Sequence, residues 1–318
     1  MPHIPSLGPD FPDAPLQLVD LPWLHEAGVE LAILRLDLID PELSGNKWFK
    51  LACHLEAARD AGAKGLISLG GPHSNHLHAL AAAGRRLGMA TVGLLRGAEQ
   101  TTPTIEDLQA FGMQLHWLGY GGYRARHRAD FFDDWLQRYG GYYCVPEGGG
   151  GLPGALGCVP LVDHVRRQLS AVGWDDYDAW WLAAGTGTTL AGLVIGEQRQ
   201  GRQRRVYGSL AGPPSHGVAE NVGKLLREAE LVDEGYRLVD GSRGGFGRFD
   251  APLAQFICDV EHITGLPLEP VYTAKAMMAL RLLVRDGYFA RGARIIFVHT
   301  GGLQGRRAAQ AALDKLLH

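Results

Sequence analysis

AWWLAAGTGTTLAGL, residues 179–193, begins with six apolar residues, turns at a glycine–threonine sequence and continues into a helical pattern. A strand that enters a helix through such a turn presents backbone N–H groups at the helix N-terminus, where partial positive charge gathers. The alternative is a structural turn in which a threonine caps the helix. The turn lacks the lysine of a Walker loop and the third glycine of a dinucleotide fingerprint, so it suits a single phosphate. The predicted phosphate ligands are Gly185, Thr186, Gly187, Thr188 and Thr189.

Short apolar runs alternate with helical patterns on both sides of this turn, which is typical of βαβ units around mostly parallel sheets. We expect strands at residues 66–69, 91–96, 114–118, 142–145, 179–184, 205–210 and 294–299. We expect helices at residues 48–61, 74–87, 103–111, 129–139, 159–171, 188–198, 219–230, 251–263 and 273–286. Residues 29–39 are expected to form a separate hairpin, and the glycine-rich residues 147–154 a hinge.

The predicted fold class is therefore α/β, with two open, mostly parallel, three-layer α/β lobes. The proposed hinge divides the chain into a small α/β domain, residues 48–156, and a large cofactor-binding domain, residues 1–47 plus 157–318. A length of 318 residues agrees with about two lobes, because domains commonly contain ~100–200 residues.

Composition excludes several classes of protein. The net charge is −3, with 31 basic and 34 acidic residues, so we expect no binding of nucleic acid or of an anionic membrane. No apolar run reaches the ~18 residues of a membrane span, and the first residues lack the pattern of a signal peptide. The four cysteines lie apart without metal-ligand spacing, which predicts reduced thiols, no metal site and a cytoplasmic protein. Glycine is abundant, with 44 residues, which indicates close approaches of the backbone.

A lysine marks the second candidate site. Residues 43–51, LSGNKWFKL, place Lys47 where a Gly–Asn turn enters an amphipathic helix. The helix dipole disfavours a cation there, and a lowered pKa would leave the amine of Lys47 nucleophilic and able to form an imine. The alternative is an ordinary solvated lysine, which is what we expect of Lys50 one turn later.

Two further strand ends carry polar groups next to glycines. Residues 68–76, SLGGPHSNH, place Ser74 and Asn75 at a helix start, with His73 and His76 beside them. A helix cap alone would need only one of these groups. Residues 297–302, FVHTGG, end another strand in a hydroxyl and two glycines. Because ligands of open α/β sheets bind at the carboxyl ends of strands, we expect these ends to converge.

The ordered set of motifs resembles one family closely. It comprises the Gly–Asn–Lys turn at Lys47, the Ser–Asn–His helix start, the Gly–Thr–Gly–Thr–Thr loop, residues 270–273 (PVYT) and residues 299–302 (HTGG). This order over about 260 residues resembles the pyridoxal-phosphate enzymes of the D-cysteine desulfhydrase and 1-aminocyclopropane-1-carboxylate deaminase family, which have the fold-type II architecture of the tryptophan-synthase-β group.

The resemblance implies a role for each motif. Lys47 would form the imine with pyridoxal 5′-phosphate and later move the proton at Cα, and the glycine–threonine loop would bind the phosphate. Asn75 would hydrogen-bond the cofactor's phenolic oxygen, while Ser74 and His76 would face the substrate carboxylate. Tyr272 would be the second acid/base group or a contact to the leaving group. The alternative for Tyr272 is a buried tyrosine with a satisfied hydroxyl. Relatives of this fold are commonly homodimers, so a homodimer is expected by analogy.

The residue at the pyridine nitrogen separates two activities. Deaminases of this family have Glu after the tyrosine and Leu before the Gly–Gly pair, whereas this chain has Thr273 and Thr300. A neutral hydroxyl is a weaker partner, adequate for removing a Cα proton and expelling a good leaving group from Cβ. The resemblance therefore favours α,β-elimination from a small amino acid, most specifically D-cysteine, giving pyruvate, ammonia and hydrogen sulfide.

Other interpretations and departures stay open. The alternatives are a deaminase of 1-aminocyclopropane-1-carboxylate, another fold-type II lyase or synthase and, more remotely, a non-catalytic nucleotide-binding module. Phe246 replaces a second family tyrosine, Pro72 and His73 replace a more usual Ile–Gln pair, and the tail after Gly302 lacks the usual proline. Because these changes lie around the expected substrate, we assign His73 and Phe246 to the substrate pocket.

Overall fold

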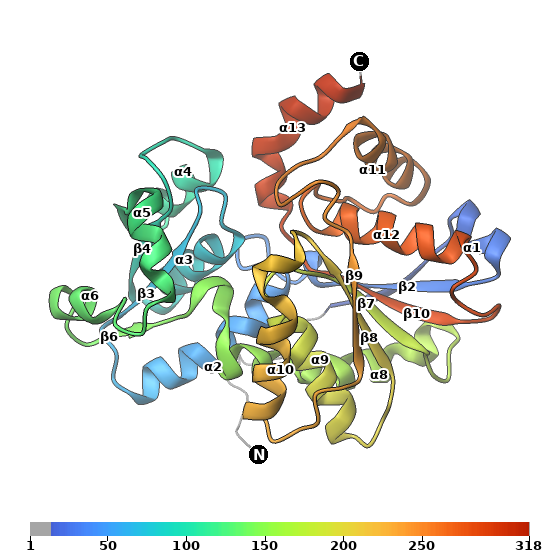
Figure 1. The fold of residues 1–318 in the computed structure, drawn as a ribbon, viewed down its shortest axis with the longest axis horizontal. Coiled ribbons are helices and arrows are strands. Elements are labelled where there is room, and N and C mark those ends of the chain that lie inside the picture. The colour runs from blue at the N-terminus through green and yellow to red at the C-terminus, as the bar shows by residue number, and fades with distance from the viewer. Residues whose placement is uncertain (1–13, 318) are drawn as a thin grey trace.

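The computed structural model describes residues 14–317 and contains two sheets, which lie side by side in Figure 1. The large sheet has the strand order β1 (Leu16–Val19), β2 (Glu30–Arg35), β10 (Arg294–His299), β7 (Ala179–Ala184), β8 (Arg205–Leu210) and β9 (Tyr236–Asp240). The small sheet has the order β5 (Gln114–Trp117), β4 (Ala90–Leu95), β3 (Gly65–Gly70) and β6 (Tyr142–Cys144). All pairs are parallel except β1 with β2, which confirms the predicted α/β class.

Helices cover the sheets (Figure 1). They are α1 (Pro22–Ala27), α2 (Asn46–Asp60), α3 (Asn75–Leu87), α4 (Pro103–Ala110), α5 (Gly119–Arg124), α6 (Asp133–Arg138), α7 (Gly151–Cys158), α8 (Pro160–Gln168), α9 (Thr188–Arg199), α10 (Val218–Glu228), α11 (Ala251–Thr264), α12 (Thr273–Arg285) and α13 (Leu303–Leu317). Within residues 14–317, no helix is both long and apolar enough to cross a bilayer.

Several predicted elements need correction. The stretch 29–39 forms β2 and a short 3-10 turn (Leu36–Leu38) instead of a hairpin of its own, and β2 pairs antiparallel with β1, which precedes α1 in the sequence. The predicted helix at 129–139 is reduced to α6, and residues 147–154, proposed as a hinge, form a 3-10 turn (Glu147–Gly149) and the first half of α7. Glycine disfavours an isolated helix, but packing between two other helices outweighs that propensity in α7. Strand β9 and helix α13 were not predicted; β9 is an edge strand with half-exposed residues, so it lacks a continuous apolar run.

The central position of strand β7 explains why its sequence is apolar throughout. It lies between β10 and β8, and all six of its residues are buried. Trp180 and Trp181 point to opposite faces, and each indole nitrogen donates a hydrogen bond, to the Glu197 carboxylate and to the Ala276 carbonyl respectively. The glycine–threonine turn therefore begins at the carboxyl end of a fully buried central strand.

Glycines let three helix backbones touch. Helix α7 packs between α2 and α9, and it meets α2 where Gly157 lies against the Phe49 carbonyl oxygen. On its other side, Gly192 of α9 lies against the Ala155 carbonyl oxygen. A Cβ atom at Gly157 or Gly192 would collide with main-chain atoms. We call this contact of α2, α7 and α9 the glycine seam, and it accounts for part of the glycine excess.

Candidate active site

The Lys47 turn is docked on the end of β10. Gly45, with φ 71°, precedes α2, and a Cβ there would collide with the Thr300 carbonyl. The same carbonyl accepts a hydrogen bond from the Asn46 backbone N–H at 3.2 Å. Two motifs more than 250 residues apart in the sequence thus meet at the carboxyl end of β10.

The amine of Lys47 has a lowered pKa. Burial lowers it to about 8 from an ordinary 10.5, and the neighbouring thiol of Cys158 opposes the shift. The sequence predicts this direction, but from the helix dipole, whereas desolvation is the main cause here. A substantial fraction of Lys47 is therefore neutral at physiological pH and able to act as a nucleophile.

The glycine–threonine loop forms the uncapped start of α9. Gly187, with φ 78°, is the N-cap residue, and no side chain caps the helix N–H groups, which remain directed outwards. The Thr186 and Thr188 hydroxyls are 2.9 Å apart. Asn46 Nδ2 donates to Thr189 Oγ1 at 2.8 Å, so the lysine turn is tied directly to the loop. The threonines therefore brace the loop while its backbone offers donors for an anion.

Lys50 was expected to be solvated, and this prediction is wrong. Its side chain is 2% exposed, and its Nζ lies 3.3 Å from Thr186 Oγ1. Residues three apart on a helix share a face, so Lys50 follows Lys47 towards the glycine–threonine loop. Burial, followed by repulsion from Lys47, lowers the pKa of Lys50 well below its usual range. The i, i+3 spacing was the signal that could have identified it.

Two histidines complete a basic cluster with these lysines. Burial and the charges of Lys47 and Lys50 hold the pKa of His76 well below its usual range, and burial lowers that of His54 to about 4. The ring of His76 points inward, with Nε2 2.8 Å from Ser68 Oγ, rather than outward from the helix start as expected of a substrate ligand. Its buried Nδ1 has no hydrogen-bond partner within the described residues and lies beside Gly149.

This cluster fits a cofactor phosphate. Two buried amines and an uncapped helix N-terminus surround one region, and each would be stabilised by a dianion. In pyridoxal 5′-phosphate, the group that reacts with Lys47 and the phosphate belong to one molecule, which suits a lysine tied to this loop.

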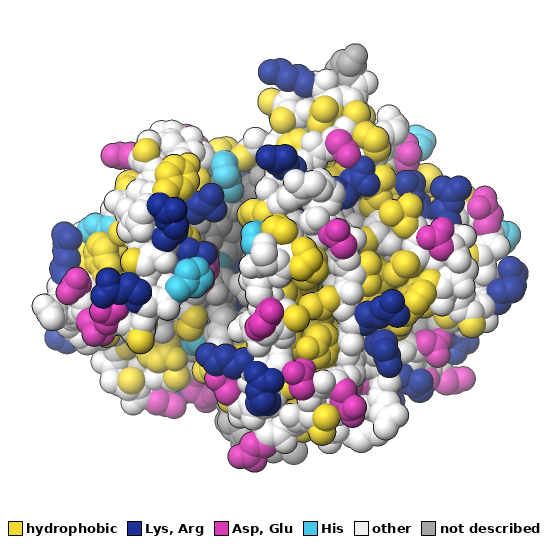
Figure 2. Space-filling view, in the orientation of Figure 1, with side chains coloured by type: hydrophobic (Ala, Val, Ile, Leu, Met, Phe, Trp, Pro, Cys, Tyr) yellow, Lys and Arg dark blue, Asp and Glu magenta, His cyan; other side chains and the backbone are white. Residues whose placement is uncertain are grey.

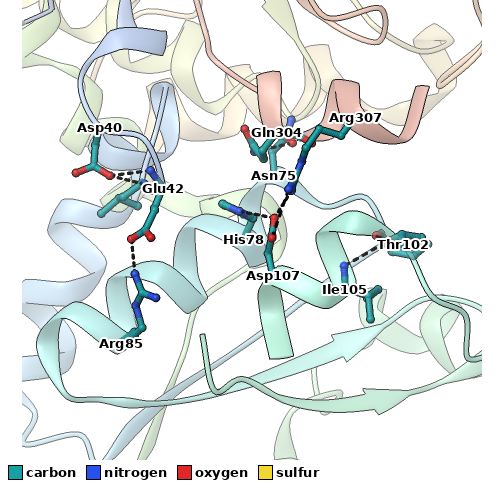
Figure 3. A network of polar contacts seen from close by, with 12 residues as sticks. Asp40, Glu42, Asn75, His78, Arg85, Thr102, Ile105, Asp107, Gln304 and Arg307 are labelled. Atoms are coloured by element: carbon teal, nitrogen blue, oxygen red, sulfur yellow. Dashed lines mark hydrogen bonds and ion pairs between the residues drawn. The ribbon is translucent and has the colours of Figure 1, made fainter. Parts of the chain in front are cut away.

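The start of α3 carries the next predicted residues. Ser74 Oγ accepts a hydrogen bond from the Leu77 N–H at 3.1 Å, so this hydroxyl caps the helix and retains its own proton to donate. Asn75 is the first residue of α3, and its Oδ1 accepts a hydrogen bond from Gln304 Nε2 at 2.9 Å (Figure 3). Sequence reasoning did not identify Gln304. His73, just before the cap, is exposed.

Tyr272 lies over the start of the glycine–threonine loop. Its Cε1 is 3.2 Å from where a Cβ on Gly185 would be, so any larger residue at this position would have to displace the tyrosine ring slightly. The Phe246 ring packs edge-to-face on Tyr272 at 5.6 Å and is itself 49% exposed. Burial, with the charges of Glu269 and Glu147, raises the pKa of Tyr272. The phenol is therefore protonated at physiological pH and can donate a proton.

A buried carboxyl group lies behind the two threonines assigned to the pyridine nitrogen. Glu269 is 3% exposed and accepts hydrogen bonds from the N–H groups of Tyr272 and Thr273, both at 2.6 Å. Burial raises the pKa of Glu269 to about 7. The Thr273 hydroxyl is fully buried and donates to the Glu269 carbonyl at 3.3 Å. Glu269 was missed, although an acidic residue just before a predicted helix start is a capping signal.

The fold and the site together define an enzyme that holds a phosphorylated cofactor between a reactive lysine and a helix N-terminus. Residues 11–301 match the pyridoxal-phosphate dependent enzyme family, and the chain belongs to this family. Its cofactor is pyridoxal 5′-phosphate, and the architecture is fold type II, as the motifs predict.

Known relatives indicate which members of this family the chain is similar to in sequence and structure. A Pyrococcus horikoshii protein, provisionally named a 1-aminocyclopropane-1-carboxylate deaminase, is 32% identical over 288 residues, covering 88% of this chain and 87% of the relative. The mitochondrial bifunctional D-cysteine desulfhydrase/1-aminocyclopropane-1-carboxylate deaminase of Arabidopsis thaliana is 27% identical over 92% of this chain and 76% of its own. The crystal structure of a homologue of ACC (1-aminocyclopropane-1-carboxylate) deaminase superposes on this structure with a TM-score of 0.83 at 30% sequence identity, and the match covers 100% of both chains. The chain is thus similar to deaminase- and desulfhydrase-type enzymes.

Proposed function

We propose that this enzyme catalyses α,β-elimination from a small amino acid, with D-cysteine as the substrate. One D-cysteine and one water would give pyruvate, ammonia and hydrogen sulfide. The observation that carries the proposal is the pair of hydroxyl residues, Thr273 and Thr300, where a deaminase of the resembled family has Glu and Leu. The name of the Arabidopsis relative, which includes D-cysteine desulfhydrase, supports the same choice.

In this proposal, pyridoxal phosphate supplies an electron sink for charge that develops at Cα. The backbone N–H groups of residues 185–189 and the Lys50 amine bind its phosphate, and Asn75 donates to its phenolic oxygen. Lys47, whose lowered pKa leaves part of the amine neutral, holds the cofactor and then moves the proton at Cα. Tyr272 keeps its phenolic proton and donates it towards the leaving sulfur. Ser74 donates its remaining proton to the substrate carboxylate.

The substrate pocket is assigned to the residues above the cofactor. We place His73 and Phe246 along its mouth, where both side chains are exposed, and His76 behind it. A groove separates the two halves of the molecule in the space-filling view (Figure 2), and the substrate would enter there. The Phe246→Tyr variant tests whether a missing hydroxyl at this mouth alters the order of preferred substrates.

The test is a substrate screen of the cofactor-loaded enzyme. Keto-acid release is measured with D-cysteine, L-cysteine, D-serine, β-chloroalanine and 1-aminocyclopropane-1-carboxylate, and sulfide is measured in parallel. We expect D-cysteine to be the best substrate, with sulfide and pyruvate in equal amounts. Lys47→Ala should lose both turnover and the visible absorption of the bound cofactor. Normal turnover of D-cysteine by Lys47→Ala would refute the role of this lysine.

A deaminase of 1-aminocyclopropane-1-carboxylate is the second candidate. The buried Glu269 favours it, because this carboxyl lies directly behind Thr273 and could strengthen that hydroxyl as a partner of the pyridine nitrogen. In the same screen, 2-oxobutanoate release from the cyclopropane acid at a higher kcat/KM than any D-cysteine turnover would decide for this activity.

We further propose a homodimer that acts in the cytoplasm. The homodimer is expected by analogy with relatives of the fold, and the dispersed, unpaired cysteines suit a reducing compartment. Light scattering at several concentrations tests the oligomeric state, and fractionation of the source cells tests the location.

A further inference from the structure

Gln304 lies where the two halves of the molecule meet. It is the second residue of α13, which follows directly on the Gly301–Gly302 pair at the end of β10. Its Nε2 donates to Oδ1 of Asn75, at the start of α3, across 229 positions of sequence. Figure 3 shows the two amides facing each other between the two helices.

The Asn75 amide is enclosed by backbone on two sides. A Cβ on Gly302 would lie 2.8 Å from Asn75 Nδ2, and a Cβ on Gly305 would lie 3.1 Å from Asn75 Oδ1. These close approaches limit where the amide can move but do not select which end is oxygen and which is nitrogen. That choice depends on the hydrogen-bond partner, because the terminal torsion of asparagine is roughly two-fold.

We propose that Gln304 is a positioning residue that fixes the orientation of the Asn75 amide, so that Nδ2–H faces the phenolic oxygen of pyridoxal phosphate. This rests on the proposed contact of Asn75 with the cofactor. The phenolic oxygen is an acceptor, so Asn75 must offer its N–H to it and its carbonyl elsewhere. Gln304 supplies the donor that holds the carbonyl end.

Helix α13 makes a second contact near α3, through Asp107 of α4. Arg307 pairs with Asp107 of α4, and His78 Nε2 of α3 lies 3.1 Å from Asp107 Oδ2 (Figure 3). Arg307 is one turn beyond Gln304, so both side chains reach from the same face of α13. This ion pair, which lies outside the cofactor site, is a second link between α13 and the region around α3.

The test compares two substitutions of nearly equal size. Gln304→Glu keeps the shape but offers only acceptors, so the Asn75 amide turns its N–H towards the new carboxylate and its oxygen towards the cofactor. Gln304→Met removes the hydrogen bond without adding a competitor. Gln310→Glu is the matched control, because it adds the same charge to an exposed position of α13.

Cofactor affinity is measured by titrating each apoprotein with pyridoxal phosphate, and the visible absorption of the bound cofactor is followed with pH. We expect Gln304→Glu to raise the dissociation constant about tenfold to hundredfold, Gln304→Met by less than about tenfold, and Gln310→Glu not at all. The pH midpoint of the visible absorption should move upwards in Gln304→Glu, because the phenolate loses its donor.

Equal effects of Glu and Met at position 304 would show a purely structural role, and no effect of either would also overturn the proposal. Unfolding midpoints of the apoproteins separate loss of cofactor contact from loss of fold. None of these measurements uses an amino-acid substrate. A wild type that binds the cofactor but fails to process D-cysteine therefore refutes the proposed function and leaves this inference intact.

Discussion

Glu269 gives a prediction whose size can be worked from the structure. The carboxyl is buried, and its pKa is raised to about 7 from an ordinary 4.5. The folded state therefore binds this proton more tightly than the unfolded state does. Stability from this group is fully present below about pH 4.5 and is lost as the pH rises to about 7. At ~1.36 kcal/mol per pKa unit, the loss is about 3 kcal/mol.

The perturbation is Glu269→Gln, which keeps the shape and removes the titrating proton. Urea unfolding of the wild-type and variant apoproteins is followed between pH 4.5 and 8, and the difference in unfolding free energy is plotted against pH. Because every other titrating group is common to both proteins, its contribution cancels in the difference. We expect the wild type to lose about 3 kcal/mol relative to the variant across this range.

Two results would refute the reasoning. A difference that stays constant with pH would show that Glu269 does not titrate with a raised pKa. If the wild type instead gains stability relative to Glu269→Gln as the pH rises, the three backbone N–H groups around the carboxylate outweigh its burial, because these groups lower its pKa. The Asp250→Asn variant is a control whose difference should stay constant between pH 4.5 and 8, because an arginine and a backbone N–H lower the pKa of that helix cap and it therefore titrates below this range.

Three further predictions concern the cofactor site. Lys50→Met replaces a buried amine by an apolar side chain, so we expect the unfolding free energy of the apoprotein to rise, while its dissociation constant for pyridoxal phosphate rises at least about tenfold. A loss of apoprotein stability, or unchanged cofactor affinity, contradicts this role. Gly187→Ala places a side chain on a backbone with φ 78° and should lower the unfolding free energy by about 1–3 kcal/mol. The control Gly201→Ala has φ 67° but open space around it, so it should lower the unfolding free energy by less and leave cofactor binding unchanged. Thr300→Leu combined with Thr273→Glu should shift kcat/KM towards the cyclopropane acid, and an unchanged substrate preference would show that the nitrogen's partner does not select the reaction.

Local patterns predicted the parts of the molecule whose structure depends on near neighbours. The apolar run of β7, the turn after it and the helix start at Ser74 are each contained in a few consecutive residues. Parallel order places the carboxyl ends of strands together within each sheet, but β7 and the strand before Ser74 belong to different sheets, so their meeting depends on how the two sheets pack. Local patterns were therefore sufficient to predict the α/β class and a site for one phosphate, and the resemblance of the ordered motifs to a known family predicted the cofactor.

The rest depends on distant neighbours. Lys50 looks like a surface lysine until α2 is seen to face the glycine–threonine loop. Gln304 acquires a role only because α13 returns to the start of α3, 229 positions away. Helix α7 was hidden by its glycines, which disfavour a lone helix yet are what packing in the glycine seam requires. Tertiary contacts, rather than propensity, decide such positions.

The glycine seam has a consequence for how far this chain can diverge. Lys47 lies at the start of α2, the glycine–threonine loop lies at the start of α9, and α7 packs between these helices with close backbone contacts at Gly157 and Gly192. The distance between these two helix starts therefore depends on two positions without a side chain, and we expect larger residues at Gly157 or Gly192 to change it. The ACC deaminase homologue has the same overall fold at 30% sequence identity, which agrees with a spacing that depends on few positions.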